Sequence, residues 1–415
     1  MKKHASAGVA KTPLWKQQGI DSNEFFETAT PSSIRSVNRS IILYLIRKHQ
    51  AISRAGLSEL TGIYRSNVSF IVEELIAEGL VIEQRANPQG RGRVPILLSL
   101  HDEGHRVLAI SIRPRYSVVA IAGLTGTIAA SVTFDTPGDP ALFLDALDTA
   151  IPGVSKKAGL KAQDKFEQVA ISVPGFVNSK TGTISWLPLL PAYGNLDLKT
   201  QVENRAGCPV AVENDCNLGA LAELSMSELD GEPLRDFVFI EIGDEGVGAG
   251  IVINRELYRG RDSTFSAEVG HMIIDSSGPL CSCGRRGCWE LYVCDRATWD
   301  RYSSGVKFTP QRFQRFIADV MSAHPRAMAS AQETARYLSL GISNVSLLLN
   351  PSTIIIAGNV CNIWNSISRT VESAFASASV AVPIRAARLT PDQLFLRGAI
   401  HLALSRIFSA PRLGW

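Results

Sequence analysis

The pattern of apolar residues changes near position 100, and this change predicts two kinds of fold in one chain. Before it, apolar residues recur every three or four positions, as on a helix that packs one face against a core. After it, short apolar strands alternate with helical segments, which is typical of an α/β domain. A chain of 415 residues is too long for one ordinary core, so a small helical domain followed by a larger α/β domain agrees with its length.

The segment 34–79 is predicted to form three helices. Ser53 can cap the second and shortest of them, and Gly62 lies in a tight turn before the third. Two predicted strands, at 80–82 and 94–100, follow as a hairpin. The order is therefore helix, helix, turn, helix, hairpin.

This order predicts a helix-turn-helix domain whose last helix enters the major groove of DNA. Arginine can pair with guanine and asparagine with adenine, and arginines at a hairpin tip suit a phosphate backbone or a narrow minor groove. Residues 1–100 hold 13 Lys and Arg against 8 Asp and Glu, which also favours an anionic partner. The alternative is a basic helical domain that binds another protein. The predicted DNA contacts are Arg54, Arg65, Ser66, Asn67, Ser69, Arg91 and Arg93.

Residues 1–33 are polar and show no sustained period, so we predict a mostly disordered basic arm. The lysines at its start are not followed by the apolar core of a signal peptide, and no apolar run in the chain approaches the ~18 residues of a membrane span. Seven cysteines in this length exclude a disulfide-stapled secreted domain. A cytoplasmic protein is expected.

Beyond the helical domain, the predicted strands fall into two similar groups. Three strands within 107–134 form a meander, and strands at 237–242 and 250–253 open a second one. Two halves that start alike indicate an internal duplication. The predicted first lobe spans 101–230, the second lobe with its cysteine-rich loop spans 231–393, and a final helix at 394–408 can pack back on the first lobe.

A cysteine cluster in the second lobe has the spacing of a metal site. Cys281, Cys283 and Cys288 are preceded by His271, and three thiolates with one imidazole suit a closed tetrahedral zinc site. Gly284 and Gly287 would let the loop turn tightly around an ion, so they are predicted to shape it. The alternative is a group of free cytosolic thiols.

Two further motifs suit ligands of α/β folds. A strand at 209–212 delivers Asn214 and Asp215 to its end, where such folds bind small molecules, although either residue could instead only cap the next helix. The glycines of 243–250 could cradle phosphate with their N–H groups, but Asp244 and Glu245 would repel a triphosphate. A hairpin turn is therefore the favoured interpretation of the glycine segment.

Two regions of the sequence resemble the ROK family of repressors and sugar kinases. In the helical domain, the string Ile52–Leu57, Leu60-Thr61-Gly62 and Gly92-Arg93 are similar to the winged helix-turn-helix of ROK repressors. In the second lobe, Glu268-Val269-Gly270-His271 followed by Cys281–Glu290 is similar to the ROK zinc motif. The resemblance implies an N-terminal winged helix-turn-helix followed by a two-lobed, actin-like ATPase fold with a sugar in its cleft. Tyr64 departs from the family, which usually has a helix-capping serine there.

The resemblance also implies roles for individual residues. One structural zinc ion per chain would be held by His271 and the three cysteines, and the loop would present Glu268 and Glu290 to sugar hydroxyls; the alternative for both glutamates is solvated surface. Asp215 matches the general base of ROK sugar kinases, and Asn214 the residue that grips the sugar. The implied sugar site is Gly175, Asn214, Asp215, Glu268, His271 and Glu290.

The nucleotide-binding elements of the kinases are altered in this chain. Kinases of the family open their first meander with Asp-x-Gly-Gly-Thr, whereas residues 109–116 contain no aspartate, glycine or threonine. Gly358-Asn359 stands where the family has a glycine pair near the adenosine. We therefore expect neither ATP binding nor a catalytic residue, although Asp215 is kept.

Together these features predict a sugar-responsive transcriptional regulator, of a kind that mostly represses, which binds palindromic double-stranded operator DNA as a homodimer or a dimer of dimers. An active ATP-dependent sugar kinase with an appended DNA-binding domain is the alternative. A zinc scaffold without ligand or DNA would leave Asn214-Asp215 and the arginine-rich hairpin unexplained. The sequence names neither the sugar nor the operator.

Overall fold

The computed structural model describes residues 31–85, 96–161, 164–261, 267–373 and 382–408. Its contacts divide the chain into two compact units. The smaller unit comprises residues 1–100 and 407–415, and the larger comprises residues 101–406. The predicted arm at 1–33 lies outside the described residues up to position 30.

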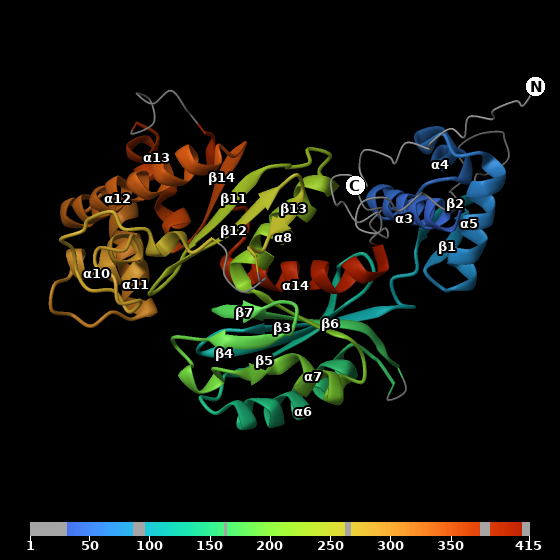
Figure 1. Cartoon of the computed structure of the whole chain (residues 1–415), viewed down its shortest axis with the longest axis horizontal. Helices are drawn as coiled ribbons and strands as arrows, with labels where there is room; N and C mark the ends of the chain where they lie inside the picture. The colour runs from blue at the N-terminus through green and yellow to red at the C-terminus, as the bar shows by residue number, and fades with distance from the viewer. Residues whose placement is uncertain (1–30, 86–95, 162–163, 262–266, 374–381, 409–415) are drawn as a thin grey trace, which may run out of the picture. The chain divides into compact units, whose positions relative to one another are not determined.

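The smaller unit is a three-helix domain with a two-stranded antiparallel sheet (Figure 1). The first helix begins three residues before its predicted start, at a proline, which is favoured in the first turn of a helix. The other elements follow in the predicted order. They are α3 (Pro31–His49), α4 (Arg54–Thr61), α5 (Arg65–Ala77), β1 (Val81–Arg85) and β2 (Ile96–Leu100).

Local signals define the turn between α4 and α5. The Ser53 side chain caps α4 by accepting a 3.1 Å hydrogen bond from the Gly56 N–H, as predicted. Gly62 ends α4 in the left-handed region, at φ 71°, where a glycine costs least. The sequence analysis missed one feature: Ile52 and Leu98 exchange two backbone hydrogen bonds, so an isolated antiparallel bridge connects the segment before α4 to β2.

The larger unit contains two five-stranded sheets with the same strand order. In each, the first strand pairs antiparallel with the second and parallel with the fourth, and the order is third, second, first, fourth, fifth. This repeat confirms the predicted internal duplication. The first sheet holds β3 (Arg106–Ile112), β4 (Tyr116–Ala122), β5 (Ile128–Asp135), β6 (Phe166–Val173) and β10 (Val210–Asn214). The second holds β11 (Phe237–Ile242), β12 (Val247–Ile253), β13 (Glu256–Tyr258), β14 (Thr353–Gly358) and β15 (Ile384–Ala386).

Each sheet has its own core. Apolar side chains of the first sheet pack against α6 (Pro140–Lys157) and α7 (Leu198–Ala206), with Phe143 and Tyr193 fully buried between them. A small sheet that the sequence analysis missed lies beside this core and holds β7 (Phe176–Asn178), β8 (Thr183–Trp186) and β9 (Leu196–Asp197).

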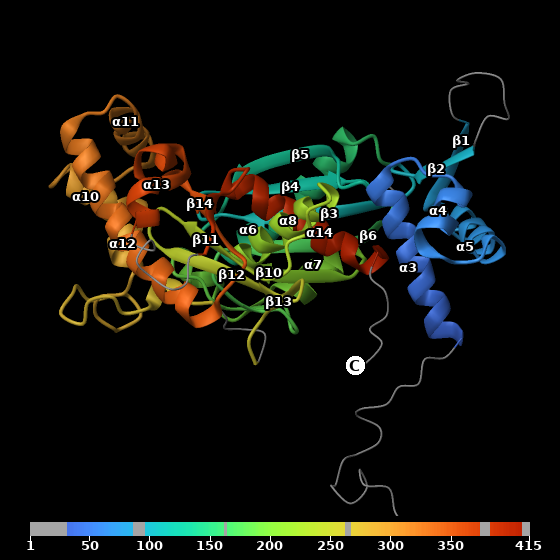
Figure 2. The ribbon, with the colours of Figure 1, turned by 90° about the horizontal axis from the view of Figure 1, so that it is seen from above.

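The second sheet packs against a group of helices that Figures 1 and 2 both show on one side of it. Trp289 and Phe316 are fully buried in this core. The two longest of these helices, which cover 310–321 and 325–349, confirm the predicted helical character of 308–349. The helices are α9 (Glu290–Val293), α10 (Asp295–Tyr302), α11 (Pro310–Met321), α12 (Pro325–Leu349) and α13 (Trp364–Ser373).

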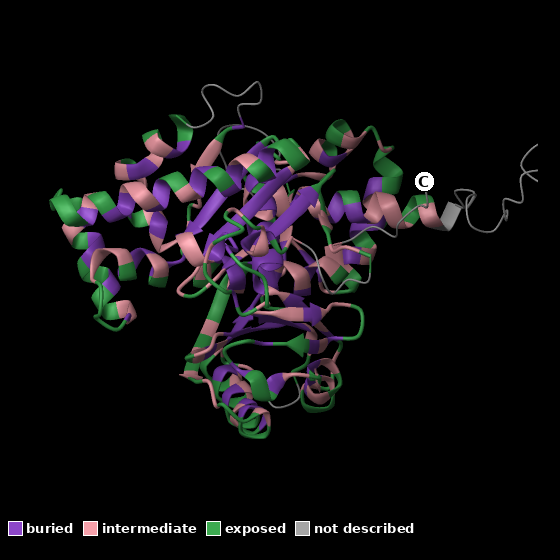
Figure 3. Cartoon of the chain, turned by 60° about the vertical axis from the view of Figure 1, so that its left-hand side comes forward, coloured by how far each residue is buried: buried purple, intermediate pink, exposed green. Residues whose placement is uncertain are grey.

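Two helices, α8 (Asp215–Leu229) and α14 (Pro391–Phe408), lie between the two sheets (Figure 1). They touch closely, because a Cβ on Gly398 of α14 would lie 2.0 Å from the carbonyl oxygen of Leu218 in α8. In the same way a Cβ on Gly250 of β12 would lie 2.6 Å from the Cys216 carbonyl oxygen. Figure 3 shows the strands beside α8 as the most buried part of the unit, so the start of α8 is held rigidly.

Candidate functional sites

The helix α5 carries the predicted base-reading residues. Its inner face buries Val68 and three further apolar residues, and this burial turns Arg65, Ser66 and Asn67 outward, where all three are exposed. Ser69 is half-buried. The exposed row lies at the start of the helix, where a helix-turn-helix contacts base edges.

Tyr64 stands at the N-cap of α5 and makes no capping hydrogen bond with its side chain. Its side chain is 81% exposed. The expected departure from a capping serine therefore leaves the first N–H groups of α5 without a side-chain partner from position 64.

Arg54 is engaged inside the smaller unit. Its guanidinium forms ion pairs with Glu83 and, at 2.6 Å, with Glu73. These carboxylates offset its charge, and a contact from Arg54 to DNA stays a prediction. Arg91 and Arg93 lie outside the described residues.

The predicted metal ligands gather in one loop of the larger unit. The ligand atoms of His271, Cys281, Cys283 and Cys288 all lie within 4.8 Å of one another. Cys283 Sγ is 3.5 Å from Cys288 Sγ, and Cys281 Sγ is 3.6 Å from His271 Nδ1. Zn–S bonds of about 2.3 Å at tetrahedral angles separate sulfurs by ~3.8 Å, so the four residues fit a zinc ion.

The loop reaches this geometry through its two glycines. Gly284 and Gly287 have φ angles of 84° and 69°, in the left-handed region, as their predicted role requires. A Cβ on Gly287 would lie 1.6 Å from the Asp275 carbonyl oxygen, so only glycine fits there. The two glycines therefore allow the compact turn that brings the four candidate metal ligands together.

The predicted sugar-binding groups of the first lobe lie where β10 meets α8. Asn214 caps α8 by accepting a 3.1 Å hydrogen bond from the Asn217 N–H, and its Nδ2 donates to the Gly175 carbonyl at 3.0 Å. Asp215 Oδ1 accepts from the Cys216 N–H at 2.8 Å. The capping interpretation is thus confirmed for Asn214, and it leaves Asp215 at the helix start, 6% exposed.

Of the two glutamates beside the metal loop, Glu290 is buried and is not solvated surface, whereas the side chain of Glu268 is exposed, as the surface alternative expects. Glu290 is 9% exposed and accepts a 3.0 Å hydrogen bond from Cys281 Sγ. The pKa of Glu268 is raised to about 7 by partial burial and, to a smaller extent, by the nearby charges of Glu290 and Asp215. The structure therefore brings these three carboxyl groups into one neighbourhood, with His271 Nδ1 3.3 Å from Glu290 Oε1.

Sequence reasoning missed a buried carboxylate that orders this neighbourhood. Glu213, 1% exposed, accepts hydrogen bonds from Ser179 Oγ at 2.9 Å and Asn217 Nδ2 at 2.9 Å, and pairs with Arg259 Nε at 2.6 Å. Since Arg259 follows β13 of the second sheet, this pair links the two lobes beside Asn214. An acidic residue at the end of an apolar strand was the available signal.

The glycine segment 243–250 forms the hairpin turn that the sequence analysis favoured. The Gly243 N–H donates to the Gly246 carbonyl at 2.9 Å between β11 and β12. Gly248 and Gly250 lie within β12, where they make room for Cys216 at the start of α8. Arg115 Nη2 of the first lobe lies 3.1 Å from Asp244 Oδ2 of the second lobe, so one of the two acidic side chains of this turn is paired with an arginine.

The sequence matches the ROK family over residues 107–406. The chain belongs to the ROK family. A xylose repressor of Bacillus spizizenii is 30% identical over 352 residues, which cover 84% of this ROK protein and 89% of the repressor.

Solved ROK structures confirm the predicted fold class. A ROK family transcriptional regulator, described as a homologue of the E. coli MLC protein, matches with a TM-score of 0.74 at 26% identity, covering 91% of this chain and 99% of that one. A ROK family glucokinase from Streptomyces griseus, in complex with glucose and AMPPNP, matches with a TM-score of 0.61 at 26% identity, covering 72% and 98%. The regulator thus matches more of this chain than the kinase does.

None of the helices in the described parts of the ROK protein combines the length and apolar character that a membrane crossing requires.

Proposed function

We propose that this ROK protein is a sugar-responsive transcriptional repressor, which binds operator DNA through its smaller unit and a sugar through its larger unit. The observation that carries the proposal is the exposed start of α5 in a winged helix-turn-helix that precedes a ROK unit. Its similarity to a xylose repressor over most of both chains supports this assignment.

On DNA, Arg65 and Asn67 would read base edges, and Ser66 and Ser69 would contact phosphates or bases nearby. Two copies of the chain would place two such helices on a palindromic operator in the cytoplasm. Arg91 and Arg93 would add phosphate or minor-groove contacts from the wing. Such contacts make affinity fall steeply with salt.

In the larger unit, Asp215 and Asn214 would accept and donate hydrogen bonds to sugar hydroxyls, with Glu268 and Glu290 on the opposite lobe. One zinc ion on His271 and the three cysteines would fix the loop that carries Glu290. His271 would face the ion with Nδ1 and leave its second nitrogen for the sugar edge. Gly175 would back the sugar through its main chain, whose carbonyl accepts a hydrogen bond from Asn214 Nδ2 at 3.0 Å. A Cβ at this position would lie 2.7 Å from the Trp186 carbonyl oxygen, so the close approach of the two strands requires glycine.

The test combines operator selection with sugar titration. The full-length protein selects sites from random DNA, and anisotropy then measures Kd for the selected site and for random DNA, with and without D-xylose or D-glucose. Asn67→Ala should weaken the selected site by about 1–3 kcal/mol while random DNA is little affected. Arg326→Ala, an exposed arginine of α12, is the matched surface control.

Asp215→Asn should remove the sugar response and leave operator affinity without sugar unchanged. Equal affinity of the wild type for selected and random DNA at physiological salt would contradict the DNA-binding role. A full panel of aldoses that neither bind nor change operator affinity would contradict the sugar-responsive role.

An active sugar kinase is the second candidate, because Asp215 is kept at the start of α8 and a glucokinase shares the ROK fold. Phosphoryl transfer depends on positioning and neutralising the nucleotide phosphates. Here Arg113 and Arg115 already bind carboxylates, and the 243–246 turn adds two acidic side chains. Turnover with ATP, magnesium and a bound sugar above ~1 s⁻¹, lost in Asp215→Asn, would establish the kinase instead.

A further inference from the structure

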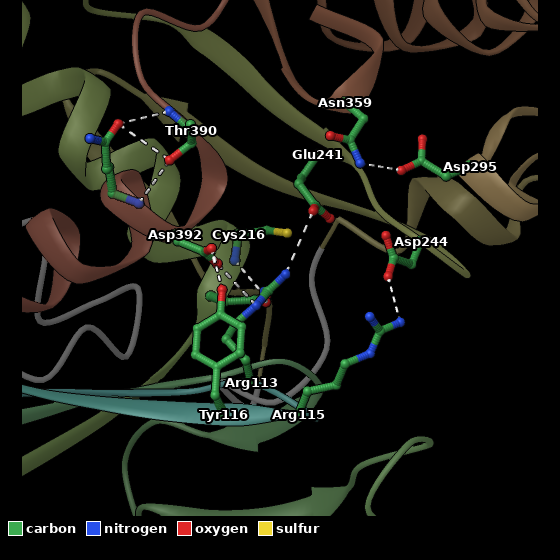
Figure 4. A network of polar contacts seen from close by, with 12 residues as sticks. Arg113, Arg115, Tyr116, Cys216, Glu241, Asp244, Asp295, Asn359, Thr390 and Asp392 are labelled. Atoms are coloured by element: carbon green, nitrogen blue, oxygen red, sulfur yellow. Dashed lines mark hydrogen bonds and ion pairs between the residues drawn. The ribbon is translucent and has the colours of Figure 1, made fainter. Parts of the chain in front are cut away.

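The guanidinium of Arg113 lies among the carboxyl groups of Asp215, Glu241 and Asp392, which come from different parts of the larger unit; Figure 4 shows it beside Glu241 and Asp392. Its Nη1 donates to Asp215 Oδ2 at 3.0 Å, at the start of α8. Its Nη2 is 4.0 Å from Glu241 Oε1 on β11, and its Nε is 3.4 Å from Asp392 Oδ1 on α14. One side chain thus connects the first sheet, the second sheet and both central helices.

The position of Arg113 is fixed on all sides. Its N–H donates to the Tyr116 carbonyl at 3.0 Å, and its own carbonyl accepts from Thr136 Oγ1 at 2.7 Å. The Phe395 ring lies under the guanidinium, 4.9 Å from centroid to Cζ. Tyr116 Oη donates to Asp392, which holds that carboxylate in place. The arginine side chain is therefore already ordered before a ligand binds, and binding costs it little further conformational entropy.

Asp215 depends on this arginine for its charge. Burial raises the pKa of Asp215, and the Arg113 charge acts against that rise. Within the described ranges, no other basic side chain forms an ion pair with Asp215 or Glu241. Without Arg113, the buried carboxyl of Asp215 would lose the nearby positive charge that favours its ionised form, and its pKa would rise further.

Protonation changes what Asp215 can do for a sugar. An ionised carboxylate accepts hydrogen bonds from hydroxyls at both oxygens, and these charge-assisted bonds are stronger than neutral ones. Both oxygens already accept one protein donor, from Arg113 Nη1 and the Cys216 N–H, and each keeps a second lone pair for a ligand hydroxyl.

We propose that Arg113 is the positioning residue of the sugar site: it keeps Asp215 a charged acceptor and ties that acceptor to Glu241 and Asp392, so that a hydroxyl bound at Asp215 acts on the contacts between the two lobes. This rests on the proposed sugar response. The arginine stands in the turn where ROK kinases carry their glycine pair, and it supplies from within the protein a positive charge next to the sugar-binding carboxylate. A sugar hydroxyl bound at Asp215 shares the carboxylate with Arg113, so the contacts of Arg113 with Glu241 and Asp392 adjust with it.

The test measures sugar affinity of the full-length protein by calorimetry, with D-xylose and D-glucose as probes. Arg113→Met should raise Kd at pH 7 by about tenfold or more, the factor that corresponds to ~1.4 kcal/mol. The ratio of variant to wild-type Kd should shrink as the pH rises, because a higher pH favours the ionised form of Asp215. Arg115→Met is the matched control, since Arg115 leaves the same turn but binds Asp244 and is 57% exposed, and its Kd should stay unchanged.

A merely structural role is excluded by a double variant. If Arg113 acts through Asp215, then Arg113→Met adds little to the loss already caused by Asp215→Asn. Arg113→Lys, which keeps the charge, should recover most of the affinity and serves if the methionine variant fails to fold. Wild-type affinity in Arg113→Met, or a loss that adds fully to that of Asp215→Asn, overturns the inference while the proposed function stands. If no aldose binds to the wild type, both this inference and the proposed sugar response are refuted.

Discussion

Glu241 makes the stability of the larger unit depend on pH near neutrality. The side chain lies on β11 and is 9% exposed. Its pKa is raised from 4.5 to about 8, mainly by burial. The charge of Arg113 opposes the rise, and the carboxylates of Asp215, Asp244 and Asp392 contribute to it. The folded protein therefore holds a proton on Glu241 at pH 7 that the unfolded chain has released.

The sign and size of the change in unfolding free energy with pH follow from this difference in protonation. A carboxyl whose folded-state pKa is raised contributes its stability below the unfolded value and loses it as the pH rises through the folded value. Between pH 6 and pH 8 the unfolded glutamate is ionised and the folded one is mostly protonated. At ~1.4 kcal/mol per pH unit, less the part of the folded group that ionises near its own pKa, the loss over this range is about 2 kcal/mol.

The assay is urea unfolding from pH 6 to pH 9, followed by tryptophan fluorescence. Four of the six tryptophans, Trp186, Trp289, Trp299 and Trp364, belong to the larger unit, so most of the signal reports on it. Glu241→Gln keeps the shape and removes the titration, so its free energy of unfolding should fall by about 2 kcal/mol less than that of the wild type between pH 6 and pH 8.

The matched control is Glu256→Gln on the exposed strand β13, which should follow the wild-type pH profile. Parallel pH profiles for the wild type and Glu241→Gln would refute the assignment of the titration to Glu241. A stability that rises with pH in the wild type over this range would refute the sign.

Three further outcomes are expected. Cys283→Ser should abolish the ~1 zinc ion per chain found by elemental analysis of protein purified without chelator, and zinc at wild-type content in this variant would exclude the proposed ligand set. Ser53→Ala should destabilise the smaller unit by about 1 kcal/mol in hydrogen exchange of α4 and leave sugar binding unaffected, and an unchanged exchange rate would show that the cap is dispensable. Gly341→Ala should lower the melting temperature and the zinc content together, because the new Cβ would lie 2.0 Å from the Trp289 ring beside the metal loop, whereas Gly153→Ala, with open space around it, should be neutral or stabilising.

The sequence alone determined the features that depend on short stretches of chain. Ser53 and Gly62 define α4 because a cap and a left-handed turn are decided within a few residues. The apolar stripe of α5 turned Arg65 and Asn67 outward for the same reason, and the spacing of three cysteines within one loop brought them together. The repeat of strand meanders also predicted the duplication that the two sheets display.

Only the tertiary structure decided which charges meet. In the sequence, Arg113 was only a residue of an altered phosphate-binding turn. No local pattern predicts its contacts with Asp215 and Asp392, which lie 102 and 279 positions further along the chain. Glu213 acquires its partner Arg259 in the same way, across the two lobes. Arg54 looked free to bind DNA until the fold set Glu73 and Glu83 beside it. For the buried members of these pairs, Asp215 and Glu213, burial removes water and makes an unpaired charge costly. For all of them the choice of partner depends on how distant segments pack, which no local pattern encodes.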